Sequence, residues 1–335
     1  MSPQAPPQPA GVRLAGTGMA IPPKVLTNDD LAEMVDTSDD WISRRTGIRQ
    51  RHIAEEATTV RELASTSVRL ALTNAGVEPA ELDFLMVATL TAEMCCPSTS
   101  ARVVAEIGAA PAGAVDLSAA CSGFVYGLNM AAGLIRTGQY THIGVVGAET
   151  LSRIVDWNDR STCVLFGDGA GAVIVSASDN PDQGCLYQSM ASDGNAWHTL
   201  YCARTEEDLP DDRDGFSGVF NTLQMNGREV YRFAVSTLQQ TITEAIEGAG
   251  IRADDLAMIV PHQSNQRILE LARTKLGLPE EKMYSNIDRY GNTSAASVPI
   301  CLNELMEAGR LHEGDLVLMV GLGGGLTWAS SLWRL

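Results

Sequence analysis

A long-period internal repeat constrains the fold of this chain more than any other feature of its sequence. Two segments, "LALTNAGVEPAELDFLMVAT" (70–89) and "ITEAIEGAGIRADDLAMIVPH" (242–262), each predict a helix, a short link and an apolar strand. Two more, "CSGFVYGLNMAAGLIRTGQYTHIGVVGAE" (121–149) and "NTSAASVPICLNELMEAGRLHEGDLVLMVGLGG" (292–324), each predict a helix closed by glycine, a polar link and a second apolar strand. Such runs occur in many α/β proteins, but their shared order favours a duplicated, layered α/β fold.

The repeat places particular residues at matching points of the two halves. Gly138 corresponds to Gly309, and the same offset of 171 residues places Asn292 opposite Cys121 at the predicted start of a helix. The apolar strands also end alike, at Ala88 in the first half and at His262 in the second. Two similar halves that pack together would bring these positions toward one shared centre.

The composition limits the classes of partner and compartment. A formal net charge of −17 disfavours non-specific nucleic-acid binding, which requires a basic surface. The chain contains no apolar run of the roughly 18–20 residues that span a bilayer, and residues 1–10 predict a disordered tail rather than a signal peptide. Seven cysteines without a CxxC pair indicate a reducing cytoplasm and no structural zinc site.

Cys121 lies at a turn of small residues, between a predicted strand and the helix that follows it. A helix N-terminus carries partial positive charge and free N–H groups, which stabilise a thiolate and lower the pKa of a thiol. This context predicts an activated nucleophile, with a buried structural cysteine as the alternative. For Cys163, Cys185, Cys202 and Cys301 we expect the buried structural role.

His262 and Asn292 are two further candidates for a reactive site. His262 ends an apolar strand in "MIVPHQSNQRI", and α/β proteins assemble their sites at the carboxyl ends of strands. Asn292, in "DRYGNTSAAS", is equally suited to a helix N-cap, and only its match to Cys121 favours a site role. The glycines of "GLGGGLTWAS" (321–330) allow close backbone approach and predict an N–H group that serves as an oxyanion donor.

These residues lie in motifs that resemble those of thiolase-superfamily condensing enzymes, specifically the β-ketoacyl-acyl-carrier-protein synthase III family. The likeness runs from about Gly11 to Leu335 and includes "DDWISRRTGIRQRHIA", "SAACSGF", "PHQSNQRI", "GNTSAAS" and "GGGLTWAS". It implies a five-layered αβαβα sandwich of two duplicated halves, 11–180 with the nucleophilic cysteine and 181–335 with the histidine and asparagine. It also implies a homodimer.

The resemblance implies a chemistry for each site residue. Cys121, His262 and Asn292 match the family's Cys-His-Asn triad, and Gly324 matches the residue whose N–H completes an oxyanion hole with that of Cys121. An acyl-CoA would acylate Cys121. Malonyl-acyl-carrier-protein would then lose CO2, and its enolate, held by His262 and Asn292, would attack the thioester to give a 3-ketoacyl product. This reaction requires no metal and no cofactor beyond the CoA thioester.

Residues outside the triad match positions that bind the two substrates. Trp41 and Arg160 match a pair that sandwiches the CoA adenine, and Arg45 matches an arginine near the CoA phosphates. Three basic residues match positions that meet the acidic carrier protein, and they would form the local basic patch that this acidic chain requires: Arg232, Arg267 and Lys275.

Two positions depart from the family pattern. Cys96 stands where some relatives have a phenylalanine that reaches across the dimer and caps the partner's acyl pocket. Leu322 precedes the glycine triplet, where the best-known members have phenylalanine. Both side chains are smaller, which predicts room for primers larger than acetyl. The segment 197–222 is longer than usual and acidic, and we expect a surface loop beside the substrate tunnel.

Several other functions share part of this pattern. A relative of specialised metabolism that acylates another acceptor, or one that condenses two long-chain acyl-CoAs, would keep the same triad. A 3-hydroxy-3-methylglutaryl-CoA synthase would carry a glutamate where this chain has Leu90, with Glu93 displaced. A non-catalytic chain-length partner would lack the nucleophile. We therefore favour the initiating condensation of fatty-acid synthesis, with a ketosynthase or acyltransferase of secondary metabolism as the alternative.

We expect Cys96→Phe to shift the preference of the enzyme from larger acyl-CoA primers toward acetyl-CoA, because the added ring fills space in the acyl pocket. Measurement of kcat/KM over a series of acyl-CoA chain lengths tests this, with Cys96→Ser as the control that changes the chemistry with little change in volume. An unchanged chain-length profile in Cys96→Phe would contradict a role of this position in the pocket.

Overall fold

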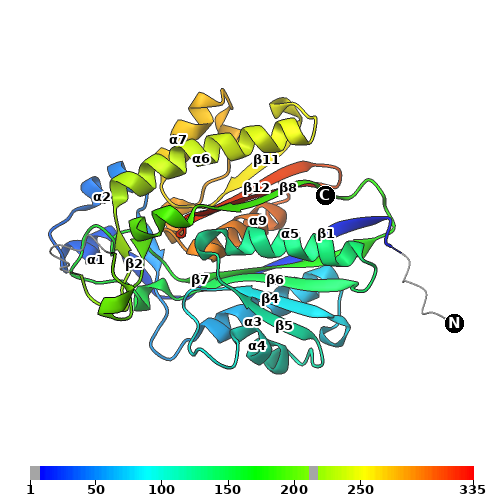
Figure 1. Cartoon of the computed structure of the whole chain (residues 1–335), viewed down its shortest axis with the longest axis horizontal. Helices are drawn as coiled ribbons and strands as arrows, with labels where there is room; N and C mark the ends of the chain where they lie inside the picture. The colour runs from blue at the N-terminus through cyan, green and yellow to red at the C-terminus, as the bar shows by residue number, and fades with distance from the viewer. Residues whose placement is uncertain (1–7, 211–217) are drawn as a thin grey trace.

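The computed structural model describes residues 8–210 and 218–335, and Figure 1 shows its elements stacked in five layers. From one outer face to the other these are α3 with α4, a five-stranded sheet, α5 with α9, a four-stranded sheet, and α6 with α7. The predicted five-layered αβαβα sandwich is therefore confirmed. The helices span Val60–Ala75 (α3), Thr99–Ile107 (α4), Gly123–Arg136 (α5), Gly227–Gly248 (α6), Gln266–Lys275 (α7) and Ser297–Glu307 (α9).

The two sheets have the same strand order. The first runs β1-β7-β6-β4-β5 and the second runs β8-β13-β12-β11, with a single parallel bridge from Ile259 of β11 to Met283 in place of a fifth strand. The first sheet contains Gly11–Ala20 (β1), Phe84–Ala88 (β4), Gly113–Leu117 (β5), His142–Glu149 (β6) and Gly169–Ser178 (β7). The second contains Gly184–Ser192 (β8), Leu256–Pro261 (β11), Leu316–Gly323 (β12) and Thr327–Arg334 (β13).

Strand directions repeat as well. β4 runs parallel to β6 as β11 does to β12. The pairs β6–β7 and β7–β1 are antiparallel in the first sheet, as are β12–β13 and β13–β8 in the second. The predicted division at residue 180 falls in the link between β7 and β8, and the boundaries of the two halves remain a prediction.

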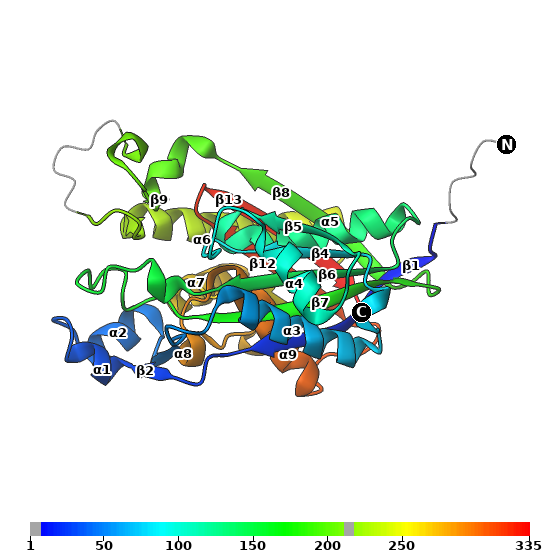
Figure 2. The same cartoon turned by 90° about the horizontal axis from the view of Figure 1, so that it is seen from below.

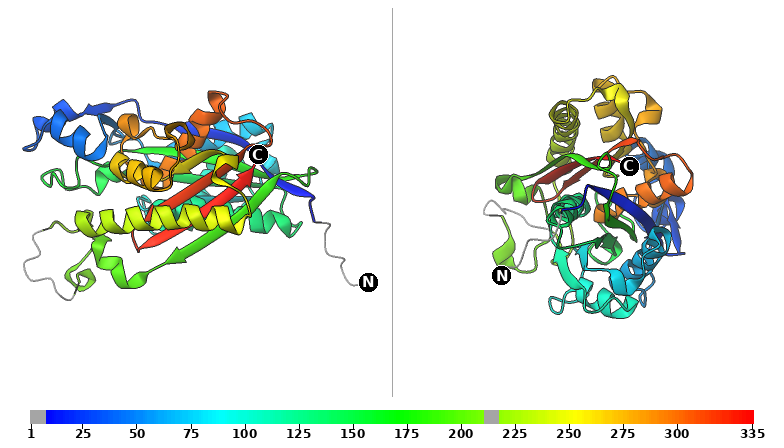
Figure 3. Two further views of the ribbon diagram at one scale, coloured as in Figure 1. Left: turned by 90° about the horizontal axis from the view of Figure 1, so that it is seen from above. Right: turned by 90° about the vertical axis from the view of Figure 1, so that its right-hand side faces the viewer.

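The central helices are largely apolar because a sheet covers two opposite faces of each, although Met130 and Gly133 of α5 remain exposed. Phe124, Val125 and Leu128 of α5 and Val298 and Leu302 of α9 belong to one buried cluster that also receives side chains from both sheets. Separate apolar clusters fill the space between α3 and α4 and the first sheet, and between α6 and α7 and the second. Figure 3 shows α6 lying along the outer face of the second sheet.

The repeat changes register between the two ends of the central helices. The glycines that follow α5 and α9, Gly138 and Gly309, keep the predicted offset, but α5 has 14 residues and α9 has 11. The short 3-10 turns that precede these helices, Ala120–Ser122 (η2) and Ser294–Ala296 (η8), are therefore 174 residues apart. The prediction that Asn292 is the counterpart of Cys121 is wrong, because α9 is about one turn shorter at its N-terminus.

The predicted equivalence of the two strand ends, Ala88 and His262, is confirmed. Val87 pairs with Val146 in the first sheet, and Pro261 pairs with Val320 at the corresponding place in the second. The next residues along the two strands, Ala88 and His262, therefore occupy equivalent positions.

Short elements gather at one end of the sandwich, as Figures 1 and 2 show. They are Val25–Thr27 (β2), Asn28–Ala32 (α1), Asp39–Thr46 (α2), Gln50–His52 (β3), Leu200–Tyr201 (β9), Gln224–Met225 (β10) and Ile287–Tyr290 (α8). The expected loop 197–222 contains β9, which pairs with β10, so this segment is more ordered than a simple loop. Its residues 211–217, and residues 1–7 of the predicted tail, lie outside the described residues. Within residues 8–210 and 218–335, no helix is long and apolar enough to cross a membrane.

Gly16→Ala should lower the free energy of unfolding by about 1–3 kcal/mol, because it overpacks the contact between β1 and α3. A Cβ atom at Gly16 would lie 2.5 Å from the carbonyl oxygen of Ala71. Gly133→Ala, on an exposed part of α5 with no atom within 4 Å of the added methyl, should instead be neutral or stabilising. Urea unfolding of both variants tests the pair, and equal effects would contradict the close β1–α3 contact.

Candidate active site

Cys121 is held in a strained turn beneath the end of β12. It lies in η2, directly after Ala120, whose φ of 46° is rarely adopted by a residue with a side chain. Two glycines of β12 make this placement feasible: a Cβ at Gly323 would lie 2.7 Å from the Cys121 nitrogen, and one at Gly321 would lie 2.8 Å from the Ser122 Cα. The glycine motif thus brings backbone against the turn that carries the thiol.

The thiol is neutral at physiological pH. Cys121 is only 8% exposed, and desolvation raises its pKa to about 12, while the nearby Ser294 hydroxyl and the Cys121 backbone lower the pKa by less. The expectation that the helix N-terminus lowers the thiol pKa is therefore wrong, because loss of water outweighs the helix. Deprotonation of Cys121 requires a base close by.

His262 is a neutral base buried next to this turn. It follows β11, is 3% exposed, and its backbone N–H donates to the Val320 carbonyl at 2.7 Å. Its Nδ1 lies 2.7 Å from the Ser297 hydroxyl, the first residue of α9. Desolvation lowers the pKa of the imidazole to about 3, so the ring carries no charge near neutral pH.

Asn292 is fixed by its backbone and by one side of its amide. Its N–H donates to the Leu165 carbonyl at 2.9 Å, and its Oδ1 accepts from the Ser294 N–H at 2.9 Å. The second contact caps the short turn before α9. Asn292 therefore acts as a cap of this turn, although not of α9 itself. Its Nδ2 makes no hydrogen bond with any described residue, which leaves that donor available for a substrate.

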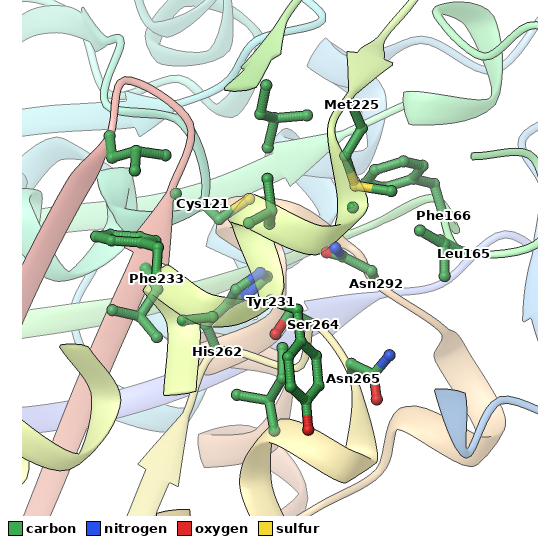
Figure 4. Close-up of a pocket in the computed structure, with 18 residues that line it drawn as sticks. Cys121, Leu165, Phe166, Met225, Tyr231, Phe233, His262, Ser264, Asn265 and Asn292 are labelled. Carbon is green, nitrogen blue, oxygen red and sulfur yellow. The ribbon is translucent and has the colours of Figure 1, made fainter. Parts of the chain in front are cut away.

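Two cavities meet at Cys121. The first, of about 120 Å³, is lined by Cys121, His262 and Asn292, and Figure 4 shows the three side chains around it. The second, of about 1190 Å³, begins at Cys121 and is lined by residues 89–95, by the end of β5 and by Gly324. The structure therefore brings the three predicted triad residues together.

The two predicted acyl-pocket residues do not lie together in the single chain. Leu322 is buried and lines the first cavity, on the same side as His262. Cys96 is exposed and lines neither cavity, although its neighbour Cys95 lines the second. A role for Cys96 across a dimer remains a prediction. Cys202 is exposed and also lines the second cavity, so the expectation that it is buried is wrong.

The predicted CoA-binding residues form one cluster, in which Trp41 is half-buried and the two arginines are exposed. The guanidinium groups of Arg45 and Arg160 lie 4.4 Å and 5.3 Å from the centre of the Trp41 ring. Arg160 also donates to the Asp36 carbonyl oxygen at 2.6 Å. An adenine stacked between Trp41 and Arg160 needs about 7 Å, twice the optimal separation of stacked atoms, so Arg160 must move before the base enters.

The three predicted carrier-protein residues are exposed on the outermost helices. Arg232 lies on α6, while Arg267 and Lys275 lie on α7, which packs beside it. Within residues 8–210 and 218–335, none of the three forms an ion pair. The Arg267 guanidinium lies 5.8 Å from the Tyr231 ring, which lines the first cavity, so this positive charge is close to the path toward Cys121.

Sequence reasoning missed Glu149, the last residue of β6. It is 0% exposed, and its carboxyl accepts hydrogen bonds from the Thr91 hydroxyl at 2.7 Å and from the Leu90 N–H at 3.1 Å. Desolvation raises the pKa of this carboxyl to about 7. The available signal was a single acidic residue at the end of an apolar strand, in "IGVVGAET".

Comparison with known proteins gives consistent matches over nearly the full chain. A family profile described as "3-Oxoacyl-[acyl-carrier-protein (ACP)] synthase III" matches residues 115–194, and its C-terminal counterpart matches residues 246–335. Two relatives named β-ketoacyl-[acyl-carrier-protein] synthase III come from Geobacillus kaustophilus and Caldanaerobacter subterraneus subsp. tengcongensis. The first is 46% identical over 97% of this chain and 99% of its own. The second is 45% identical over 95% of this chain and 96% of its own.

Solved structures agree with these sequence matches. The 3-oxoacyl-[acyl-carrier-protein] synthase III of Aquifex aeolicus superposes with a TM-score of 0.90 at 43% identity, over 97% of this chain and 100% of its own. The priming β-ketosynthase of the R1128 polyketide biosynthetic pathway superposes with a TM-score of 0.92 at 36% identity, over 100% of this chain and 99% of its own.

His262 should make folding stability depend on pH. Its pKa is about 3 when folded and near 6.5 in an unfolded chain, so only the unfolded chain binds the proton between these values. Above pH 6.5 the neutral ring of His262 does not lower the free energy of unfolding. As the pH falls from 6.5 toward 3, the free energy of unfolding decreases by up to about 1.4 kcal/mol per pH unit, because only the unfolded chain takes up the proton. Urea unfolding at pH 4.5–7.5 should show a shallower dependence in His262→Gln. The exposed control His198→Gln should keep the wild-type slope, and a wild-type slope in His262→Gln would contradict burial of a neutral ring.

Proposed function

The chain belongs to the β-ketoacyl-acyl-carrier-protein synthase III family and is a condensing acyltransferase of the type that initiates fatty-acid synthesis, and we propose that Cys121 carries the acyl primer in its reaction. One observation carries this proposal: Cys121, His262 and Asn292 come from separate parts of the chain and line one cavity. The primer arrives as an acyl-CoA, and the acceptor is malonyl-acyl-carrier-protein.

Acyl transfer starts from a neutral thiol and a neutral imidazole. As the Cys121 sulfur attacks the thioester carbon, its proton passes to His262, and the N–H groups of Cys121 and Gly324 bind the oxyanion. The C–S bond to CoA then breaks, and the CoA sulfur leaves with the proton held by His262. The high pKa of Cys121 supports a coupled transfer, because a free thiolate is costly in this buried site.

The condensation step requires hydrogen-bond donors to the enolate oxygen, whereas the acyl-transfer step required His262 to accept a proton. Malonyl-acyl-carrier-protein loses CO2, and its enolate oxygen accepts hydrogen bonds from Asn292 Nδ2 and from His262. The Ser297 hydroxyl can donate to Nδ1 or accept from it, so it supports either tautomer of the ring. His262 can therefore act as an acceptor in the first step and as a donor in the second. The enolate carbon attacks the acyl-Cys121 carbonyl, the C–S bond to Cys121 breaks, and the 3-ketoacyl product leaves on the carrier protein. The departing sulfur takes up one proton from solvent, by way of His262, which restores the neutral thiol.

The second cavity supports a primer larger than acetyl. It begins at Cys121, has a volume of about 1190 Å³, and is lined in part by apolar side chains such as Leu90, Met94 and Ile154. The match to a priming ketosynthase of a polyketide pathway favours the second candidate function, which shares the chemistry but serves secondary metabolism. The primer with the highest kcat/KM distinguishes the two.

We also propose a homodimer joined along β5. This strand is the outer strand of the first sheet, and each of its five residues is only partly buried, so its edge is free to pair with a second copy. A partner there would cover the second cavity, which is lined by the end of β5 and residues 89–95. All seven cysteines are unpaired, which suits a reducing cytoplasm. The proposed reaction needs no cofactor besides its CoA substrate.

Incubation with a panel of acyl-CoAs should add one acyl group to Cys121. Mass spectrometry of the tryptic peptide 103–136 detects it, because this peptide contains no other cysteine. Malonyl-acyl-carrier-protein should then remove the label as a 3-ketoacyl product. Cys121→Ser should take no label, Cys202→Ser should behave as wild type, and Asn292→Ala should acylate but condense at least about 100-fold more slowly.

The other outcomes are also informative. A label that persists after addition of malonyl-acyl-carrier-protein supports transfer to a different acceptor. Failure of every acyl-CoA to label Cys121 contradicts the assignment of this residue as the nucleophile.

A further inference from the structure

A buried carboxyl group that the proposed reaction does not use lies beside the nucleophile. Among the described residues, Glu149 accepts hydrogen bonds from neutral donors, the Thr91 hydroxyl and the Leu90 N–H, with the Thr89 hydroxyl at 3.5 Å. It forms no ion pair with any residue in the described parts of the chain. A buried carboxylate without a cation is costly, so this group is poised to take up a proton.

The Ser294 hydroxyl lies near both this carboxyl and the Cys121 thiol. Ser294 is 1% exposed, and it lines the same cavity as Cys121 and Thr91. The turn that carries Ser294 (η8) packs against both η2, which holds Cys121, and β6, which ends at Glu149. The Ser294 hydroxyl lowers the pKa of both Cys121 and Glu149. Yet among the described residues the hydroxyl completes a hydrogen bond with none. Its single proton can be donated to the sulfur or to the carboxylate, but not to both.

We propose that Glu149 is a positioning residue that controls the nucleophile through the Ser294 hydroxyl. When Glu149 is protonated, its O–H donates to Ser294 Oγ, and the Ser294 O–H donates to the Cys121 sulfur as the thiol proton leaves to His262. When Glu149 is ionised, the Ser294 O–H turns to the carboxylate. The sulfur then loses its donor and faces a negative charge. The inference rests on the proposed role of Cys121 as the nucleophile.

The groups around Glu149 set the direction of the effect. Three ionisable side chains act directly on this network: Cys121 from η2, Asp168 from the segment before β7, and His262 from the end of β11. None of these three carries a positive charge near neutral pH. The cavity that Cys121 and Ser294 line also holds Arg153, Arg204, Glu93 and Asp116, and Arg153 is close enough to Asp168 to lower its pKa. Asp168 adds to the raised pKa of Glu149, and ionised Glu149 in turn raises the pKa of Cys121. A rise in pH through about 7 therefore ionises Glu149 and opposes formation of the thiolate.

The rate of iodoacetamide alkylation at Cys121, followed from pH 6 to 10 on peptide 103–136 of the full-length protein, tests the proposal. Glu149→Gln keeps a neutral amide in place of the protonated acid, and it should alkylate about tenfold faster than wild type at pH 8. Near pH 6, where Glu149 is protonated and the Ser294 O–H faces the sulfur, Ser294→Ala should alkylate severalfold more slowly than wild type. In the Ser294→Ala background, Glu149→Gln should give less than about a threefold gain, because the connecting hydroxyl is gone.

Two controls separate charge from packing. Glu149→Asp keeps the charge and should alkylate as slowly as wild type, whereas a fast Glu149→Asp would mean that loosened packing exposes the thiol, and would overturn the proposal. Glu304→Gln changes a carboxylate that lines neither cavity and is held by Asn286 and Tyr284, and it should keep the wild-type pH profile. Thermal unfolding checks that each variant is folded.

Two results would overturn the inference directly. The first is a wild-type pH profile in Glu149→Gln. The second is a full tenfold gain in the Ser294→Ala background, which would mean that the charge acts without the hydroxyl. Both are independent of acyl-CoA, so they are distinguishable from a failure of Cys121 to take an acyl group.

Discussion

The burial of α5 and α9 between two sheets is the constraint on which the rest of this structure depends. Each helix has a sheet on two opposite faces, so most of its side chains are apolar and buried, and the two cavities meet the helices at their N-terminal ends. The strand order repeats in the two sheets, which brings the N-termini of both helices and the carboxyl ends of β4 and β11 to one region. Cys121, Asn292 and His262 lie at these points, and their convergence follows from the layers.

Desolvation governs the chemistry of this region more than the helix dipoles do. It keeps the Cys121 thiol protonated, the His262 ring neutral and the Glu149 carboxyl near the middle of its titration. Before substrate binds, neutral Cys121 and His262 place little charge in this poorly solvated space. Charge develops only when a substrate supplies the acyl carbon that the thiol attacks or the enolate oxygen that the donors bind. The hydroxyls of Ser294 and Ser297 suit such a site, because a hydroxyl can both donate and accept.

Much of this arrangement was predictable from the sequence, and the failures have physical causes. The duplicated α/β organisation and the equivalence of Ala88 and His262 followed from apolar periodicity, whereas the five layers and the grouping of the triad residues followed from the resemblance of the motifs to a known family. The predicted match of Asn292 to Cys121 was wrong because the sequence before α9 has no clear cap residue to mark where the helix begins. The prediction of a lowered pKa for Cys121 was wrong because the burial of this thiol depends on segments distant in the chain, such as the backbone of residues 321–323. Glu149 was missed because its burial depends on Thr91 and Leu90, which lie 58 and 59 residues away in the sequence.

The unequal lengths of α5 and α9 explain how two similar halves contribute different functional groups to one site. Two identical halves would offer two copies of one functional group across their shared axis, which suits a symmetric ligand. Because α9 begins about one turn later than α5, the segment before α9 is not helical and presents the amide of Asn292, whereas the thiol of Cys121 lies directly before α5. A difference of one helical turn thus lets two similar halves present different groups to one substrate, a thiol that holds the acyl group and an amide that binds the attacking enolate.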